Sequence, residues 1–364
     1  MSMSVGPFSI AAQLVSTLST LSARPAPRPA GPSAAGGATI AAAPAPGLGF
    51  KVVRGKDRGA YYRKVEAEPS KLYKGIAGTG YLPQVSFDPK RFYVGPNGMD
   101  DWMTGPLDRP SVYMGGNANG HEADVGLTWD RVYDSQGRPT YTDNAEGSDM
   151  RDPAHRFAVE KRGTTKVLVD GNGREVARGA DVDKKLKELR PNFAFRPFWR
   201  APEWNNPKPG SRENVYFYPG EKFNMSVTVL GKGQVRLDIS GADAFNNKVS
   251  FSKPIPAPGF GEGGLESFKR VNSIDQFYVD SKGVRHAVER TNVRPTRTVA
   301  HSGGWESVSL LRRPPATGRV AMTGDKFTEV RGPDTYDRYH DIFHLWGFDK
   351  SKGGERVDIV PFSN

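Results

Sequence analysis

Turn-forming residues occur at such short intervals along this chain that few long helices can fit between them. The 364 residues include 42 glycines and 29 prolines, and the segments between them are short and rich in alternating apolar, aromatic and β-branched residues. Parallel strands need crossover connections of a dozen or more residues, usually helices, which this pattern does not supply. We therefore predict an all-β fold, an antiparallel jelly-roll β-sandwich.

Two pairs of segments are predicted as β-hairpins because alternating apolar residues flank a glycine-containing turn. They are Phe223–Leu230 with Gln234–Ser240, and Gln276–Val279 with Val284–Val288. Further strands are expected at Val85–Phe87, Arg91–Val94, Ser111–Met114, Ala123–Val132, Phe157–Val159, Thr165–Val169, Phe193–Arg200, Trp305–Leu311 and Arg356–Val360. One helix is predicted over Asp181–Leu189, and Thr335–Leu345 fits a helix or a strand.

Residues 1–49 differ in composition from the rest of the chain. They are almost entirely Ala, Pro, Ser, Gly and Thr, and the first charged side chain is Arg24. Such a segment cannot bury enough apolar surface to offset the entropy of ordering it, so we predict a disordered Ala/Pro-rich leader or linker over residues 1–49. Residues 50–364 are predicted to form a single large β-sandwich domain with an irregular C-terminal extension.

Composition restricts where such a protein acts and what it binds. The absence of cysteine excludes disulfides and thiolate chemistry and fits an exported bacterial protein. Val5–Leu21 lacks the preceding basic residues of a secretory signal, yet we expect a secreted or cell-surface location. No run approaches the roughly 20 apolar residues of a membrane helix, so no membrane span is predicted.

The chain carries a surplus of positive charge. Lys and Arg number 51 and Asp and Glu number 40, a difference of 51 − 40 = 11, which favours anionic partners. The basic residues are scattered along the chain, so no nucleic-acid groove is predicted. A phosphate-binding Walker loop and the Gly-x-Ser-x-Gly motif of serine hydrolases are both absent.

A glycine-rich turn leads into a predicted strand that carries Glu122 and Asp124. Side chains at positions i and i+2 of a strand share a face, so two carboxyl groups at this spacing can approach the roughly 5.5 Å separation used by retaining glycosidases. Glu122 and Asp124 are therefore the candidate catalytic residues. The alternative is a pair of surface carboxylates that form ion pairs with nearby Arg or Lys side chains.

The run from Glu122 to Asp124 resembles the first half of the Glu-x-Asp-x-x-Glu or Glu-x-Asp-x-Glu motif of concanavalin A-like lectins and glucanases. Gly126 or Leu127 stands where those glucanases carry a second glutamate. The resemblance extends as a strand pattern over about residues 87–311 and implies a jelly-roll sandwich that binds or cleaves polysaccharide. Legume-type lectins of this superfamily hold calcium with a Glu-x-Asp pair, so the resemblance implies Ca²⁺ as the alternative to having no cofactor.

Aromatic and arginine side chains are the candidate ligand-binding residues. Sugar rings stack on aromatic faces, while Arg and Asn side chains bind the hydroxyl groups. The predicted set is Trp129, Arg196, Trp199, Arg200 and Trp204. The alternative is that these aromatic rings form the core of the sandwich.

Two histidines four residues apart, His340 and His344, would share one face of a helix, as in a two-histidine metal site. Because this stretch is not clearly helical, we predict no metal site.

Taken together, these patterns predict a carbohydrate-binding, lectin-like protein that recognises polysaccharide, acidic polysaccharide included, on a concave sheet. The first alternative is a glycoside hydrolase or polysaccharide lyase that uses Glu122 and Asp124. The second is a structural protein of an envelope or matrix. The sequence leaves open whether the protein is an enzyme and how many copies assemble.

Overall fold

The structure is a computed structural model, and it describes residues 48–54, 59–96, 98, 104–143, 153–201, 203–242, 247–287, 293–333 and 342–361. These residues belong to one compact unit. Most of the predicted leader and His340 lie outside the described residues.

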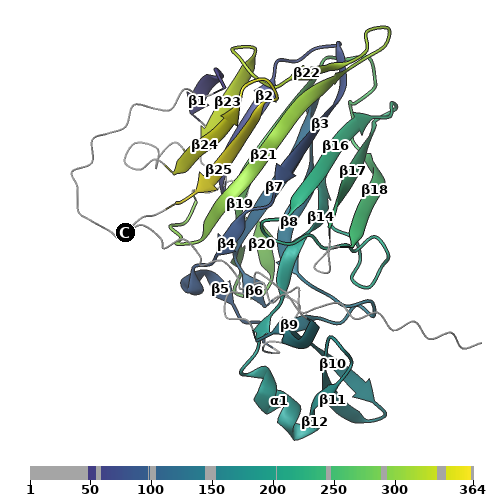
Figure 1. Ribbon diagram of the computed structural model, residues 1–364, viewed down its shortest axis with the longest axis vertical. Coiled ribbons are helices and arrows are strands. Elements are labelled where there is room, and N and C mark those ends of the chain that lie inside the picture. Colours follow the sequence, from purple (N-terminus) through teal and green to yellow (C-terminus); the bar gives the residue numbers. More distant parts are fainter. Residues whose placement is uncertain are drawn as a thin grey trace, which may run out of the picture. The chain divides into compact units, whose positions relative to one another are not determined.

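Two large sheets form the sandwich (Figure 1). The first has the order β1-β23-β2-β19-β7-β8-β14-β15, with β20 paired to β19, and the second has the order β18-β17-β16-β3-β21-β25-β24, with β22 and β4 paired to β21. Adjacent strands are antiparallel apart from the parallel pair β1 and β23. Several strand pairs within each sheet join segments that are distant in the sequence. The predicted all-β jelly-roll sandwich is confirmed.

The strands of the first sheet are β1 (Lys51–Arg54), β2 (Ala60–Ala67), β7 (Asp108–Ala118), β8 (His121–Arg131), β14 (Phe193–Arg200), β15 (Trp204–Asn205), β19 (Glu266–Val279), β20 (Arg285–Ala287) and β23 (Phe327–Gly332). Those of the second are β3 (Tyr73–Tyr81), β4 (Gln84–Ser86), β16 (Lys222–Val229), β17 (Gln234–Ala242), β18 (Lys248–Pro256), β21 (Val299–Arg312), β22 (Arg319–Ala321), β24 (Phe343–Asp349) and β25 (Gly354–Ile359). A separate two-stranded pair joins β5 (Phe92–Tyr93), which follows the 3₁₀ turn η1 (Pro89–Arg91), to β6 (Gly105–Pro106).

A smaller sheet is inserted between β8 and β14, which pair with each other. Its order is β12-β11-β10-β9-β13, and its buried apolar residues include Tyr141, Phe157 and Leu168. The elements of the insertion are β9 (Thr140–Thr142), the 3₁₀ turn η2 (Pro153–His155), β10 (Arg156–Arg162), β11 (Thr165–Asp170), β12 (Glu175–Arg178), α1 (Ala180–Leu186) and β13 (Arg190–Pro191). The predicted helix is thus confirmed as α1, shorter at its C-terminal end than expected.

Alternation of apolar and polar residues builds the main core. In the hairpin of β16 and β17, the residues Phe223, Met225 and Val227 are buried against the other sheet while their neighbours face outward. Lys232 takes a positive φ of 53° in the turn between two glycines, which closes the hairpin in the predicted register. Both predicted hairpins are confirmed.

The C-terminal residues are more regular than predicted. The ambiguous segment Thr335–Leu345 enters the strand β24 at Phe343, which pairs with β25 at the edge of the second sheet. The sequence also gave no prediction for β2, β3 or β18, in which charged residues or glycines replace some of the expected apolar positions.

Charged side chains lie between the two sheets. Arg63 of β2 donates its Nε to Glu329 (2.8 Å) and both Nη groups to Glu355 of β25, with Nη2 2.9 Å from Oε2. Arg270 of β19 pairs with the same Glu355 carboxylate. Burial alone would raise the pKa of Glu329, but the guanidinium of Arg63 lowers it below its usual range. These pairs join β2 and β19 of the first sheet to β25 of the second.

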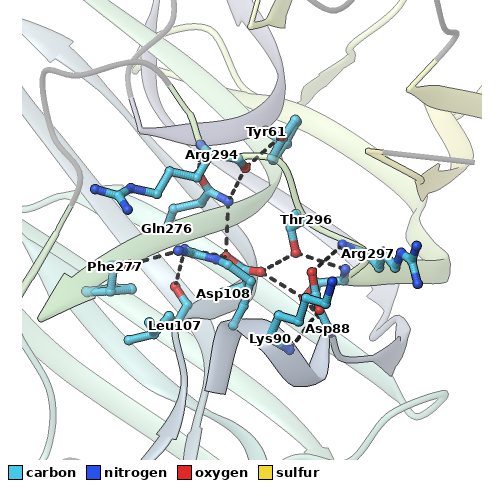
Figure 2. Close-up of polar contacts among 12 residues, drawn as sticks. Tyr61, Asp88, Lys90, Leu107, Asp108, Gln276, Phe277, Arg294, Thr296 and Arg297 are labelled. Carbon is cyan, nitrogen blue, oxygen red and sulfur yellow. Dashed lines mark hydrogen bonds and ion pairs between the residues drawn. The ribbon is translucent and has the colours of Figure 1, made fainter. Parts of the chain in front are cut away.

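A second buried network holds the connection before β21 against the end of β7. Figure 2 shows the carboxylate of Asp108, which has no exposed surface, among donors from several segments. Its oxygens accept from Arg91 (2.8 Å), Gln276 (3.1 Å), Thr296 (2.5 Å) and Thr298 (2.9 Å). Removing the carboxylate would take away one hydrogen-bond acceptor from all four side chains at once.

We expect Asp108→Ala to lower the free energy of unfolding by about 3–5 kcal/mol, because it leaves the buried Arg91 guanidinium without its counter-ion. Urea unfolding followed by circular dichroism measures the loss. The matched control is Asp183→Ala on α1, whose exposed pair with Lys166 should cost less than about 1 kcal/mol. Equal losses in the two variants would contradict the role assigned to Asp108.

Candidate functional site

The outer face of the first sheet, the face turned away from the sandwich core, carries a row of charged residues across five strands. The registers place Glu66 of β2 opposite Lys269 of β19, Lys269 opposite Gly115 of β7, Gly115 opposite Asp124 of β8, and Asp124 opposite Arg200 of β14. Opposed residues share a face of a sheet, so these side chains form one cluster, which we call the outer-face cluster.

Two buried groups, Asp124 and Lys269, form the centre of this cluster. The Lys269 ammonium lies 2.6 Å from Asp124 Oδ1 and also contacts Glu122, and the side chains of Lys269 and Asp124 are each 3% exposed. Arg200 lies 2.6 Å from Asp124 Oδ2 and 3.5 Å from Glu122. Glu122 is 46% exposed and Arg200 is 33% exposed, so these two are the members that a ligand can reach.

Gly115 makes the ion pair between Lys269 and Asp124 geometrically possible. It occupies the row between them, and without a side chain it leaves the space across which Lys269 reaches. A Cβ atom at Gly115 would lie 1.9 Å from the carbonyl oxygen of Ala123, closer than any real contact. The predicted glycine-rich turn is therefore wrong for Gly115 and Gly116, which lie within β7 and allow close backbone packing beneath the cluster.

Glu66 extends the cluster toward β2. Its Oε1 accepts from Ser267 Oγ (2.8 Å) and Asn117 Nδ2 (3.0 Å), and its Oε2 pairs with Lys64 (2.7 Å). Burial works to raise the pKa of Glu66, but the charge and hydrogen bond of Lys64 lower it below the usual range. Glu66 therefore stays ionised at neutral pH.

Aromatic rings continue the outer face on the side of β14. Phe198, which is 1% exposed, stacks beneath Trp204 of β15 with ring centroids 4.3 Å apart and an angle of 10°, and it meets Tyr113 edge-on at 5.6 Å. Trp204 lies opposite Arg200 in the register, so this half-buried tryptophan lies beside the partly exposed guanidinium of Arg200.

Carboxyl groups of this face have pKa values shifted in opposite directions. Burial raises the pKa of Asp275 on β19, with Asp124 among the charges acting on it. For Asp124 burial acts in the same direction, but the charges of Lys269 and Arg200 outweigh it and lower the pKa. The face therefore holds one carboxyl group that binds a proton more readily than usual and one that loses it more readily.

The structure brings together four of the residues predicted from sequence: Glu122, Asp124, Arg200 and Trp204. The ion pairs with Lys269 and Arg200 agree with the alternative interpretation of Glu122 and Asp124 as ion-paired carboxylates, but Asp124 is buried and does not lie at the surface as that interpretation expected. The missed members are Lys269, Glu66, Tyr113 and Asp275. Lys269, Glu66 and Asp275 lie more than 50 positions from Asp124 and reach it only through strand pairing, which leaves no spacing pattern in the sequence.

Three other predicted ligand-binding residues do not belong to the cluster. Trp129 is 1% exposed in the core, where its ring meets Phe195 edge-on at 5.0 Å, so it cannot act as a ligand platform. Trp199 points inward and stacks against Phe251 at the margin of the core. Arg196 is on the outer face but buried, held by Asp130 and the carbonyl oxygen of Pro207. The alternation of β14 places Phe195 and Trp199 inward and Phe198 and Arg200 outward.

Within the described residues, no group of three or more His, Asp or Glu side chains is placed to hold a metal ion. The carboxylates of Glu122 and Asp124, which the resemblance offered to calcium, face ammonium and guanidinium groups instead. No helix of the described residues has the length and apolar character needed to cross a membrane.

Comparison with known proteins gives no family assignment. No family model and no curated protein matches the chain. Similar solved structures include scytalido-glutamic peptidase with a transition state analog inhibitor, at 9% identity over 83% of this chain and 99% of that chain with a TM-score of 0.40. A second structure of that peptidase, with a peptide-based analog, has 10% identity, the same coverage and a TM-score of 0.37. SCP-B of the Eqolisin family of peptidases, in complex with the tripeptide Ala-Ile-His, has 10% identity over 84% and 100% of the chains and a TM-score of 0.30. Likenesses of this size carry no conclusion about activity.

We expect Asp275→Asn to raise the free energy of unfolding at pH 7. A carboxyl group whose pKa is raised on folding stabilises the protein below its ordinary pKa, and that contribution is lost as pH rises through the folded value. Asparagine does not ionise, so the variant avoids this loss of stability. The free energy of unfolding of the variant should therefore exceed that of the wild type by an amount that grows between about pH 4 and pH 7. Urea unfolding at a series of pH values measures it.

The matched control, Asp124→Asn, has the opposite sign, because the lowered pKa of Asp124 means that its ionised form stabilises the fold at neutral pH. It should be less stable than the wild type at pH 7, and the difference should shrink as pH falls below about 4. Destabilisation by both substitutions at pH 7 would contradict the assignment for Asp275.

Proposed function

We propose that the protein binds polysaccharide on the outer face of its first sheet. The observation that carries the proposal is the adjacency of the partly exposed Arg200 and the exposed Glu122 to the half-buried Trp204, whose ring rests on the buried Phe198. Sugar binding combines these two elements, because the apolar face of a sugar ring packs on an aromatic ring while its hydroxyl groups bond to charged side chains.

The ion pairs keep the binding groups in place before any ligand arrives. Arg200 is held at 2.6 Å by the buried Asp124, so its remaining N–H groups keep a fixed direction. Glu122 is held by the buried Lys269. A ligand therefore meets one oriented donor and one oriented acceptor, and it does not have to order two free side chains.

The guanidinium also suits an acidic polysaccharide. Arg200 presents a planar donor group that pairs with carboxylates, and the net charge of +11 attracts anions over longer distances. An exposed pair of this kind weakens at high salt because mobile ions screen it. Acidic polysaccharides are thus the expected ligand class, recognised with a salt-dependent affinity.

We expect the full-length protein to bind acidic polysaccharides on a glycan array and Trp204→Ala to weaken that binding at least tenfold. The control is Trp346→Ala, which removes an exposed tryptophan of β24 in the second sheet and should bind as the wild type does. Glu122→Gln tests the charged half of the site with little change in shape. Self-association without affinity for any glycan would overturn the proposal in favour of a structural role.

Hydrolysis of the bound glycan by Glu122 and Asp124 is a second candidate function. Both carboxylates contact the ammonium group of Lys269, so they lie near enough to each other for the paired carboxyl groups of a glycosidase. In this scheme the exposed Glu122 faces the substrate, while Asp124 stays ionised because the charges of Lys269 and Arg200 lower its pKa against the effect of burial.

If the face is catalytic, Glu122→Gln should abolish the release of reducing ends from a polysaccharide that the wild type cleaves. Wild-type protein that binds glycan and releases no product would reject the hydrolase and leave the binding function intact.

A further inference from the structure

A second site lies apart from the outer-face cluster, where the inserted sheet meets the segment before β16. A cavity of about 530 Å³ is lined there by Tyr133, Asn192, Asn214, Tyr216 and Tyr218, among others. Its volume falls within the roughly 300–1,000 Å³ of small-ligand pockets. No member of the outer-face cluster contributes to it.

Two amide oxygens in this lining have no hydrogen-bond donor. The Asn192 side chain has no exposed surface, and its Nδ2 donates to Thr140 Oγ1 (3.2 Å) while its Oδ1 is unpaired. Asn214 donates Nδ2 to Tyr216 Oη (2.7 Å), and its buried Oδ1 is also unpaired. Buried polar atoms are nearly always paired, so a molecule with hydrogen-bond donors would complete both groups.

Tyr216 adds a hydroxyl group to the lining. Its Oη accepts from the backbone N–H of Tyr133 (2.9 Å) and lies 2.7 Å from the side-chain amide of Asn214. Burial raises the pKa of Tyr216 well above its usual value, so the proton stays on the oxygen at physiological pH. Asn192, Asn214 and Tyr216 together offer hydrogen-bond acceptors and donors, which a ligand with several hydroxyl groups can satisfy together.

The charged side chains of the lining, Asp134, Arg138, Glu160, Asp170 and Arg156, already have partners, that of Arg156 included. Arg138 pairs with Asp134 (2.7 Å) and Glu160 (3.3 Å), and Asp170 accepts from the backbone of Asn172 and Arg174. A charged ligand would have to displace one of these pairs. A neutral ligand would leave all of them in place.

We propose that this cavity binds a neutral pyranose unit. The tyrosine rings supply apolar surface for a sugar ring, while Asn192, Asn214 and Tyr216 exchange hydrogen bonds with its hydroxyl groups. The cavity is separate from the outer face, and this proposal does not depend on the polysaccharide binding proposed for the outer face.

The test uses the full chain and the methyl glycosides of glucose, galactose, mannose and N-acetylglucosamine, with binding followed by saturation-transfer NMR and calorimetry. At least one of them should bind, and Asn214→Ala should weaken it about tenfold or more, because a site built to bond hydroxyl groups discriminates through them. Ala158→Trp, which places a large ring at the half-buried Ala158 of the lining, should abolish binding. Lys161→Trp, at an exposed position of the same strand, is the steric control and should bind normally.

Several outcomes would overturn the proposal. Failure of all four glycosides to bind the wild type would reject a pyranose site. Binding that survives Ala158→Trp would place the ligand elsewhere, and a glucuronide that binds more tightly than the neutral glucoside would reject the neutral ligand class. Trp204→Ala separates the two proposals, because it should weaken polysaccharide binding on the outer face and leave the glycoside affinity unchanged.

Discussion

Two adjacent buried cations on β19, Lys269 and Arg270, set the constraint on which the arrangement of the strands depends. Successive residues of a strand point to opposite faces, so Lys269 lies on the outer face and Arg270 lies between the sheets. A buried charge is tolerated only when a counter-charge reaches it. Asp124 of β8 meets Lys269, and Glu355 of β25 meets Arg270. One dipeptide thereby ties its own strand to a strand of the same sheet and to a strand of the opposite sheet.

The same constraint explains why a polar cluster is fixed on the outer face. Lys269 needs a carboxylate at short range, and the absence of a side chain at Gly115 provides the path to Asp124. Asp124 then has a second oxygen to offer, and this oxygen orients Arg200. The buried ion pair of Lys269 and Asp124 thus positions the partly exposed guanidinium of Arg200. The fold requires this buried pair, and the pair in turn holds the groups that a ligand can reach.

The sequence predicts the parts of this architecture that alternate regularly. Both hairpins, the strand Phe193–Arg200 and the helix in the insertion were foreseen because apolar spacing and turn residues agree there. β2 was not, because Arg63 stands at an inward position of its alternating pattern. Part of the site was predicted, because Glu122 and Asp124 lie two residues apart on one strand. Lys269 and Asp275 reach the same face only through strand pairing. Trp129 faces inward because the alternation of β8 places its side chain in the core, although a tryptophan is a residue type that suits sugar binding.

The strands β8 and β14 connect the two proposed sites. Asp124 and Arg200 are opposed near one end of this pair, while Val132 and Asn192, just beyond its other end, line the cavity. Eight residues separate Asp124 from Val132, which corresponds to roughly 26 Å along an extended strand. A single sugar ring cannot touch both ends, so each site must hold its ligand with its own contacts. The insertion that interrupts the chain between β8 and β14 supplies much of the wall of the cavity and leaves the strand pairing, and with it the outer-face cluster, intact.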